Sequence, residues 1–309
     1  MISQTSGLFI PLFLLPFITR EYSVEEVALY ILSISLVSFS FLIFDFGLST
    51  YGIKRTAELK QSKNEVSLLF SKTITLKLIA LTTLLLLLVV LFFAMEDNAY
   101  IKVCLYSFVA IFFQSMIPYW LFQSFDKMFV VTIINILARL GSVLLGISFI
   151  FAGFEIYSII LANGVAWLVS SIFSLYYLKR LGFRVNLCTE IQVVFRFLYD
   201  VKGFYFSRLA VSSYVYSNVF IISTMSAVSL AAYGIADYLY KIIQALVNSI
   251  TQALFPQIAN GKSLIVFMRT LIMLLFLLVS VATLFFLYSA NVINFLYGQE
   301  YIDATPLVH

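Results

Sequence analysis

Six polar side chains recur along one of the most apolar segments of the chain. At about 100° per helical residue they fall within an arc of about 100°, and leucine, isoleucine and valine cover the rest of the predicted helix. An Asp or Lys at the centre of a bilayer costs about 2.5 to 3.5 kcal/mol, so such residues face a protein interior or a water-filled cavity. The stripe therefore indicates a substrate or ion path through a membrane, and it consists of Asp237, Lys241, Gln244, Asn248, Thr251 and Gln252.

A structural interpretation of the same stripe stays open. Asp237 and Lys241 are one helical turn apart and would neutralise each other as an i,i+4 pair, while the amides would join helices by hydrogen bonds. The length of the stripe, about four turns, favours a lined cavity. The sequence therefore predicts substrate-binding roles for Lys241, Gln244 and Asn248 and an ion-coupling role for Asp237.

Two arginines lie inside other apolar segments. Arg139 shares a predicted helix face with Asn135 and Ser142, and Arg208 shares one with Tyr216. Both would line a cationic cavity and are predicted to bind substrate. The alternative is that a long side chain extends to the membrane surface, which is easier for Arg208 than for the deeper Arg139.

Two further charges lie nearer to the ends of predicted spans. Lys77 is close to the cytoplasmic end of its span, and we expect it to extend to the surface. Asp45 ends a span beside Gly47 and is a second candidate for ion coupling. Its alternative role is an ion pair with Lys54 or Arg55.

Composition indicates an integral membrane protein. Hydrophobic residues make up 62% of the chain and charged residues 11%, against about 25% charged residues in soluble domains, and the mean hydropathy is +1.03. The apolar segments lack the strict alternation of barrel strands, and each can span a bilayer as a helix of about 20 residues. The predicted fold class is an all-α, polytopic inner-membrane bundle of about nine spans, at 5–20, 27–46, 72–94, 101–122, 128–151, 156–178, 204–225, 230–258 and 265–288.

Charge asymmetry between loops predicts the orientation. Lys and Arg gather in the loops after the second, fourth, sixth and eighth spans, whereas Glu and Asp dominate the others. Basic loops stay in the cytoplasm, so the N-terminus is expected there. The net charge of +4 is spread over these loops, which favours contact with membrane lipids and excludes a nucleic-acid groove.

A polar segment divides the predicted spans into two lobes. We expect an N-terminal six-helix lobe at 1–180, a cytoplasmic amphipathic linker at 181–203 and an incomplete C-terminal lobe at 204–309. Two-lobed transporters bind substrate between the lobes near the membrane midplane.

Residues for other chemistry are sparse. The one histidine, His309, is terminal, and Cys104 and Cys188 lie in different predicted environments. Neither a histidine-based catalytic site, a metal cluster nor a disulfide is expected, and no glycine-rich phosphate loop occurs. The sequence predicts no cofactor and no enzyme activity.

Four motifs occur along the chain: PFITR at 16–20, FDFGLS at 44–49, YGIADYLYKIIQALVNSITQALFPQIA at 233–259 and FLYGQEY at 295–301. In their order and spacing they resemble those of the O-antigen flippases of the multidrug/oligosaccharidyl-lipid/polysaccharide exporter superfamily.

The resemblance implies twelve helices in two lobes and alternating access. It also implies translocation of undecaprenyl-diphosphate-linked oligosaccharide from the cytoplasmic to the periplasmic leaflet, with a polysaccharide polymerase and a chain-length regulator as partners. A diphosphate crossing a low-dielectric layer requires basic groups in a wet cavity, a requirement that Arg139, Arg208 and Lys241 meet.

The chain departs from the family pattern in two places. The family often has an acidic residue followed directly by Lys in the eighth helix, whereas here Asp237 precedes Tyr238 and the next basic residue is Lys241. The sequence also stops about where a tenth helix would begin. Two expectations stay open: little or no activity, or activity that needs a complementing polypeptide.

Two other functions compete with flipping. A cation-coupled multidrug exporter of the same superfamily would have an acidic or aromatic cavity. A membrane polysaccharide polymerase would carry a large periplasmic loop, and every predicted outward loop here is short.

Overall fold

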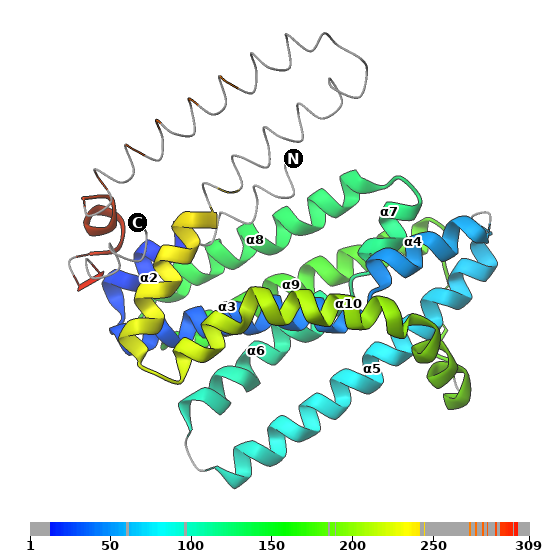
Figure 1. Cartoon of the computed structure of the whole chain (residues 1–309), viewed down its shortest axis with the longest axis horizontal. Coiled ribbons are helices and arrows are strands. Elements are labelled where there is room, and N and C mark those ends of the chain that lie inside the picture. The colour runs from blue at the N-terminus through cyan, green and yellow to red at the C-terminus, as the bar shows by residue number, and fades with distance from the viewer. Residues whose placement is uncertain are drawn as a thin grey trace.

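Long helices packed side by side form the molecule, as the computed structural model in Figure 1 shows. The structure describes residues 13–59, 62–95, 98–184, 186–188 and 190–241, with positions 244, 272, 276, 280, 283, 288, 291–298, 300 and 301. Strands are absent from these residues. The helices are α2 (Leu15–Glu21), α3 (Val24–Phe44), α4 (Leu48–Glu58), α5 (Lys63–Ala94), α6 (Ala99–Met116), α7 (Tyr119–Ser124), α8 (Met128–Phe151), α9 (Ile156–Arg180) and α10 (Ile191–Ser223), and residues 227–241 and 291–297 are also helical.

Five segments of the described chain are long and apolar enough to cross a membrane. They are Val24–Glu58, Lys63–Ala94, Ala99–Ser124, Met128–Phe151 and Ile156–Arg180, and they coincide with the second to sixth predicted spans. The prediction of an all-α, polytopic membrane protein is confirmed. The predicted spans at 5–20, 230–258 and 265–288 lie partly or mostly outside the described residues.

α8 and α9 each end in a glycine motif that gives hydrogen-bond partners to the last backbone carbonyls of the helix. In α8 and α9 the residue after the C-cap is a glycine in the left-handed region, Gly153 at φ 73° and Gly182 at φ 88°. After α9, the N–H of Gly182 donates to Lys179 O and that of Phe183 to Leu178 O, which is the Schellman arrangement. Membrane helices require such closure because lipid offers no hydrogen-bond partners.

Neighbouring helices approach closely through small residues. α8 packs against α9, and α6 packs against both α9 and α3. Ala138 and Ser142 on α8, with Ala162, Ala166 and Ser170 on α9, are all buried. Small side chains at these buried positions allow the helix backbones to approach closely.

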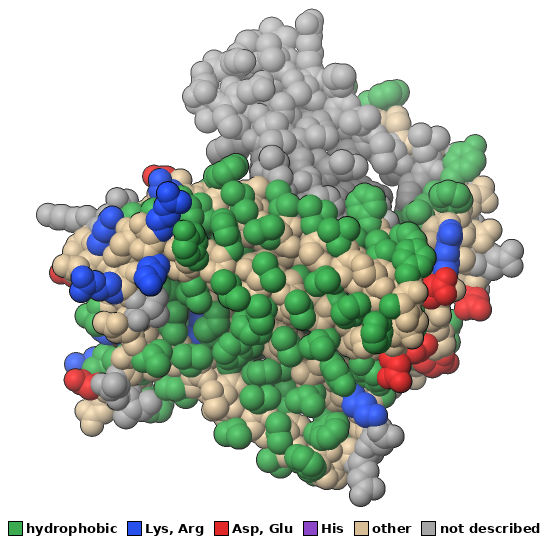
Figure 2. All heavy atoms as spheres, turned by 180° about the vertical axis from the view of Figure 1, so that it is seen from behind, with side chains coloured by type: hydrophobic (Ala, Val, Ile, Leu, Met, Phe, Trp, Pro, Cys, Tyr) green, Lys and Arg blue, Asp and Glu red, His purple; other side chains and the backbone are tan. Residues whose placement is uncertain are grey.

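Surface charge divides between the two ends of the bundle. Figure 2 shows hydrophobic side chains over the broad middle of one face, with most Lys and Arg at one end and most Asp and Glu at the other. An apolar belt between two polar ends is the surface expected of a protein that crosses a bilayer.

α10 is one continuous helix of 33 residues. It joins the amphipathic part of the predicted linker to the predicted seventh span. In Figure 1 it crosses in front of α3, against which it packs. α10 is not among the five most apolar segments, because it carries Arg208, Asn218 and many serines and tyrosines.

The connection from α9 to α10 is held on α5 by a row of hydroxyls, Ser67, Ser71 and Thr75. These accept hydrogen bonds from the backbone N–H groups of Arg184 (3.4 Å), Asn186 (3.2 Å) and Cys188 (2.9 Å), respectively. Two residues of an extended connection advance by about 6.6 Å, and one turn of α5 advances by about 5.4 Å. Because these two distances are similar, every second amide of the connection meets a hydroxyl one turn further along α5. The α5 hydroxyl row therefore sets the register of this connection.

Replacing Thr75 by Val keeps the side-chain shape and removes the acceptor for the Cys188 amide. Such a hydrogen bond contributes about 0.5 to 1.5 kcal/mol, so we expect that amide to exchange up to about tenfold faster. Hydrogen–deuterium exchange of the protein in detergent micelles measures the effect. Thr83→Val is the control, since the exposed Thr83 hydroxyl donates to Ile79 O of its own helix. Unchanged exchange at Cys188 would contradict the proposed register.

Candidate functional site

Arg139 lies among tyrosines contributed by three other helical segments. Its guanidinium is close enough to the hydroxyls of Tyr119 on α7, Tyr216 on α10 and Tyr238 in the helix 227–241 for electrostatic interaction. Tyr119 donates to Oδ1 of Asn135, one turn before Arg139 on α8, at 3.1 Å. We call Arg139 and these three tyrosines the Arg139 cluster.

Two polar atoms at this cluster are buried without a partner among the described residues. One is Nε of Arg139 and the other is the hydroxyl of Tyr30, which neighbours Tyr238. A buried donor without an acceptor costs about 1 to 3 kcal/mol. A guanidinium N–H is a donor that suits the oxygens of phosphate or carboxylate, so the chemistry of the Arg139 cluster is compatible with an anionic ligand.

Asp237 and Lys241 form an ion pair beside the cluster. Nζ of Lys241 donates to Oδ2 of Asp237 at 2.5 Å, with side-chain exposures of 43% and 23%. Asp237 also influences Tyr216 and Tyr238 electrostatically, and both tyrosines face Arg139 as well. The ion pair of Asp237 and Lys241 is thus linked to Arg139 through Tyr216 and Tyr238, which interact with both Asp237 and Arg139.

Of the four remaining residues of the polar stripe, the structure describes one. Gln244 is helical and exposed. Asn248, Thr251 and Gln252 lie outside the described residues.

A second polar group forms where α3 turns into α4. Two successive residues in the left-handed region, Phe46 at φ 51° and Gly47 at φ 71°, turn the chain. The Asp45 carboxylate then accepts from the backbone N–H of Ser49 at 3.1 Å, and the Ser49 hydroxyl accepts from Nη2 of Arg208 at 2.7 Å. The predicted site residues Asp45 and Arg208 therefore meet through Ser49.

The structure corrects the expectation for Lys77. Its side chain is only 4% exposed, and Nζ donates to the carbonyl oxygen of Ser115 at 2.7 Å. Pro118 interrupts the helix between α6 and α7, and the Tyr119 N–H bonds to Ile117 O instead of continuing the α-helical pattern. The carbonyl of Ser115 is thereby freed, and a buried lysine satisfies it.

Lys77 also lies near enough to Asp45 for their charges to interact. We call Asp45, Ser49, Arg208 and Lys77 the Asp45 junction. Sequence reasoning missed the place of Lys77, although Pro118 was a signal that a neighbouring carbonyl would need a donor.

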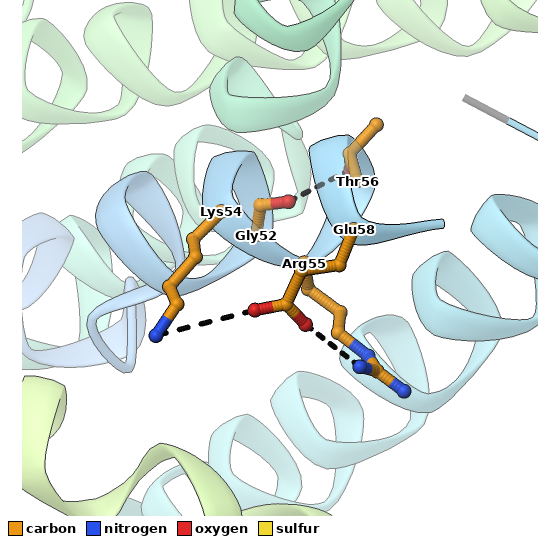
Figure 3. A network of polar contacts seen from close by, with 5 residues as sticks. All are labelled: Gly52, Lys54, Arg55, Thr56 and Glu58. Carbon is orange, nitrogen blue, oxygen red and sulfur yellow. Dashed lines mark hydrogen bonds and ion pairs between the residues drawn. The ribbon is translucent and has the colours of Figure 1, made fainter. Parts of the chain in front are cut away.

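The basic residues first considered as partners of Asp45 have a different one. Lys54 and Arg55 on α4 both approach Glu58, at 4.0 Å and 2.7 Å, as Figure 3 shows. Thr56 on the same helix donates to Gly52 O at 2.7 Å. Asp45 instead accepts a hydrogen bond from the Ser49 N–H and interacts with the charge of Lys77.

A pocket of about 470 Å³ lies at the basic end of the bundle, beside this face of α4. Both signs of charge line it, so its lining does not favour ligands of one charge. Its lining residues are Tyr51, Arg55, Leu59, Glu65, Leu68, Leu69, Lys72, Val193, Arg196, Phe197 and Asp200.

Comparison with known proteins identifies a family and relatives that match most of the chain. The family model described as "Polysaccharide biosynthesis protein" matches residues 1–262. A Shigella dysenteriae protein named "Putative O-antigen transporter" is 26% identical over 254 residues, covering 81% of this chain and 63% of that protein. An Escherichia coli K12 protein of the same name is 25% identical over 259 residues, covering 83% of this chain and 62% of that protein.

The chain thus spans less than two thirds of the length of these curated relatives. No solved structure matches it.

Replacing Gly47 by Ala tests the Asp45 junction. A Cβ there would lie 2.6 Å from the backbone carbon of Phe204 on α10, and its φ of 71° suits few L residues. Backbone strain of this kind costs about 1 to 3 kcal/mol, so thermal unfolding in detergent is expected at a lower temperature. Gly203→Ala is the matched control, because a Cβ at Gly203 meets nothing within 4 Å. Equal melting temperatures for the two variants would show that α10 does not press on this turn.

Proposed function

The chain belongs to the polysaccharide biosynthesis protein family, and we propose that it flips a lipid-linked oligosaccharide across the bacterial inner membrane. The cargo is undecaprenyl diphosphate carrying an O-antigen or other polysaccharide repeat unit, moved from the cytoplasmic to the periplasmic leaflet by alternating access. The names of the two curated relatives support this class of cargo. The gathering of Lys and Arg at one end of the surface in Figure 2 supports a cytoplasmic position for that end of the bundle.

The observation that carries the proposal is the buried Nε of Arg139, which lacks a hydrogen-bond partner in the described part of the chain. A structural arginine at this depth would be expected to use its donors on protein acceptors. Arg139 instead interacts electrostatically with phenol groups, of which Tyr119 donates to Asn135. An anionic group of the cargo would accept a hydrogen bond from the unpartnered Nε of Arg139.

The diphosphate explains why donors are needed in this place. Moving an ionised phosphate into a medium of low dielectric constant is prohibitively costly unless charges and hydrogen bonds replace its water. We assign the diphosphate or acidic sugars to Arg139, Arg208 and Lys241. Gln244 and Asn248, which follow Lys241 at helical spacing in the sequence, would contact neutral sugar hydroxyls.

Ion coupling is assigned to Asp237 and Asp45. Protonation of Asp237 would release Lys241 from its ion pair and leave the ammonium free for the cargo. Protonation of Asp45 would weaken its acceptance of the Ser49 N–H, beside the bond between Ser49 and Arg208. Protonation of Asp237 would thus change the interactions of Lys241, and protonation of Asp45 would change those of Arg208 through Ser49.

The basic character of the site favours this cargo over that of a multidrug exporter. An exporter of organic cations requires an uncompensated acid, whereas Asp237 is paired with Lys241. The positive charge of Arg139 would repel a cation, because a guanidinium remains charged and offers donors only.

Replacing Arg139 by Gln is expected to reduce glycan export at least tenfold without lowering the amount of protein in the membrane. Hydrogen bonds to charged groups contribute about 1.5 to 3 kcal/mol, and about 1.4 kcal/mol corresponds to tenfold. Export is measured in a flippase-deficient strain from the O-antigen on the cell surface. Arg180→Gln is the matched control, since Arg180 is exposed in the last turn of α9.

Because the relatives are longer, export is measured for the chain alone and for the chain extended with the corresponding C-terminal region of the Escherichia coli relative. If Arg139→Gln leaves export unchanged in an active form of the protein, the assigned role of Arg139 is wrong.

Replacing Asp237 by Asn is expected to remove the response of transport to a proton gradient. The neutral amide cannot gain a proton, so Lys241 would no longer be released in a pH-dependent way. The rate of flipping in proteoliposomes is compared with and without an imposed pH gradient. Asp200→Asn, at an exposed position of α10, is the control. A variant at Asp237 that still accelerates to the wild-type extent under the gradient would exclude this residue from coupling.

A further inference from the structure

A groove opens on the side of the bundle between α5, α6 and α9. It has a volume of about 670 Å³, within the range of about 300 to 1,000 Å³ typical of small-molecule sites. None of its lining residues is acidic. They are Ile74, Phe112, Phe113, Met116, Ser171, Ile172, Leu175, Lys179, Phe183, Arg184 and Asn186.

Most of this groove is apolar and open to the outside. Ile172 and Leu175 on its α9 side are exposed, while Ile74 and Met116 form its buried floor. From Ser171 to Lys179 the groove follows α9 for about 12 Å. An exposed apolar channel of this length on a membrane-spanning helix is suited to a hydrocarbon chain.

Basic side chains lie at one end of the groove. Lys179 is in the last turn of α9, and Arg184 follows two residues after Gly182 ends that helix. Both are exposed, and neither forms an ion pair with any residue that the structure describes. They place positive charge where the apolar channel meets the polar end of the bundle.

The position of Arg184 is held by contacts on both sides. Its own N–H donates to Ser67 of the α5 hydroxyl row, and that of Asn186 donates to Ser71. Phe183, just before it, is buried and stacks edge-on against Phe125 with ring centroids 5.0 Å apart. The basic end of the groove is therefore part of a fixed connection.

We propose that this lateral groove is a binding site for an anionic phospholipid of the surrounding membrane, with one acyl chain along α9 and the headgroup phosphate at Lys179 and Arg184. The charge of the groove supports this occupant, because two basic residues and no acidic ones line it.

A membrane phospholipid suits this site better than the cargo lipid does. The groove shares no lining residue with the Arg139 cluster or the Asp45 junction, although Lys77 of the junction also lies on α5. A lipid held here would contact α5, α6 and α9 without entering the proposed transport path. The proposal is thus independent of the transported substrate.

Native mass spectrometry of the full chain, released from detergent micelles, tests the site. Phosphatidylglycerol and phosphatidylcholine with identical acyl chains are titrated separately. The wild-type protein is expected to retain phosphatidylglycerol more tightly. The double variant Lys179→Gln/Arg184→Gln is expected to bind it about 25-fold more weakly, at about fivefold for each basic residue removed, with phosphatidylcholine binding unchanged.

Two further variants separate the groove from general surface charge. Leu175→Trp adds bulk inside the apolar channel and is expected to weaken binding of both lipids. Arg180→Gln removes a neighbouring exposed charge that does not line the groove and is expected to leave binding unchanged. Thermal unfolding of each variant checks that the fold is intact.

Three results would overturn the proposal. The first is equal loss of phosphatidylglycerol binding in Arg180→Gln and in the double variant, since that would reflect surface potential alone. The second is equal affinity of the wild-type protein for the two phospholipids. The third is displacement of phosphatidylglycerol by equimolar undecaprenyl phosphate, which would assign the groove to the cargo lipid.

Discussion

The bilayer offers no water to buried polar groups, and this constraint explains most of the local structure. The glycines after α8 and α9 close helix ends, the α5 hydroxyl row satisfies the amides of a connection, and Lys77 satisfies a carbonyl freed by Pro118. These groups have partners within the protein. Other buried polar atoms of the described residues have none, and among them the Nε of Arg139 is the one that belongs to a charged side chain.

α10 links the two polar groups of the candidate site. Arg208 and Tyr216 are eight residues apart on this helix, about 12 Å along its axis. The first bonds to Ser49 after the end of α3, and the second bonds to Ser38 within α3. Since a helix moves as a rigid element, a displacement of α10 against α3 would change both groups together. Alternating access requires a coupling of this kind between anion binding and helix position.

The candidate site was only partly predictable. Arg139, Arg208 and Lys241 stand out because charged residues are rare in apolar segments, and spacing alone indicates that Asp237 and Lys241 can pair. Tyr119 and Tyr238 could not be assigned to Arg139, because aromatic residues in a membrane helix are as common at lipid as at an interior. The position of Lys77 depends on how the break between α6 and α7 packs against α5. The spacing of residues within a single helix does not determine this packing.

The amino-acid sequence by itself determined which segments are helical and apolar, where most of them end and which end of the bundle is basic, because these properties depend on neighbours within a few residues. The tertiary structure decided which faces meet. It placed Arg139 among tyrosines from three other helical segments, joined Asp45 to Arg208 through Ser49, and continued the expected linker helix into α10. These outcomes depend on packing between residues far apart in the chain, where side-chain fit selects one of many arrangements that the same apolar pattern allows.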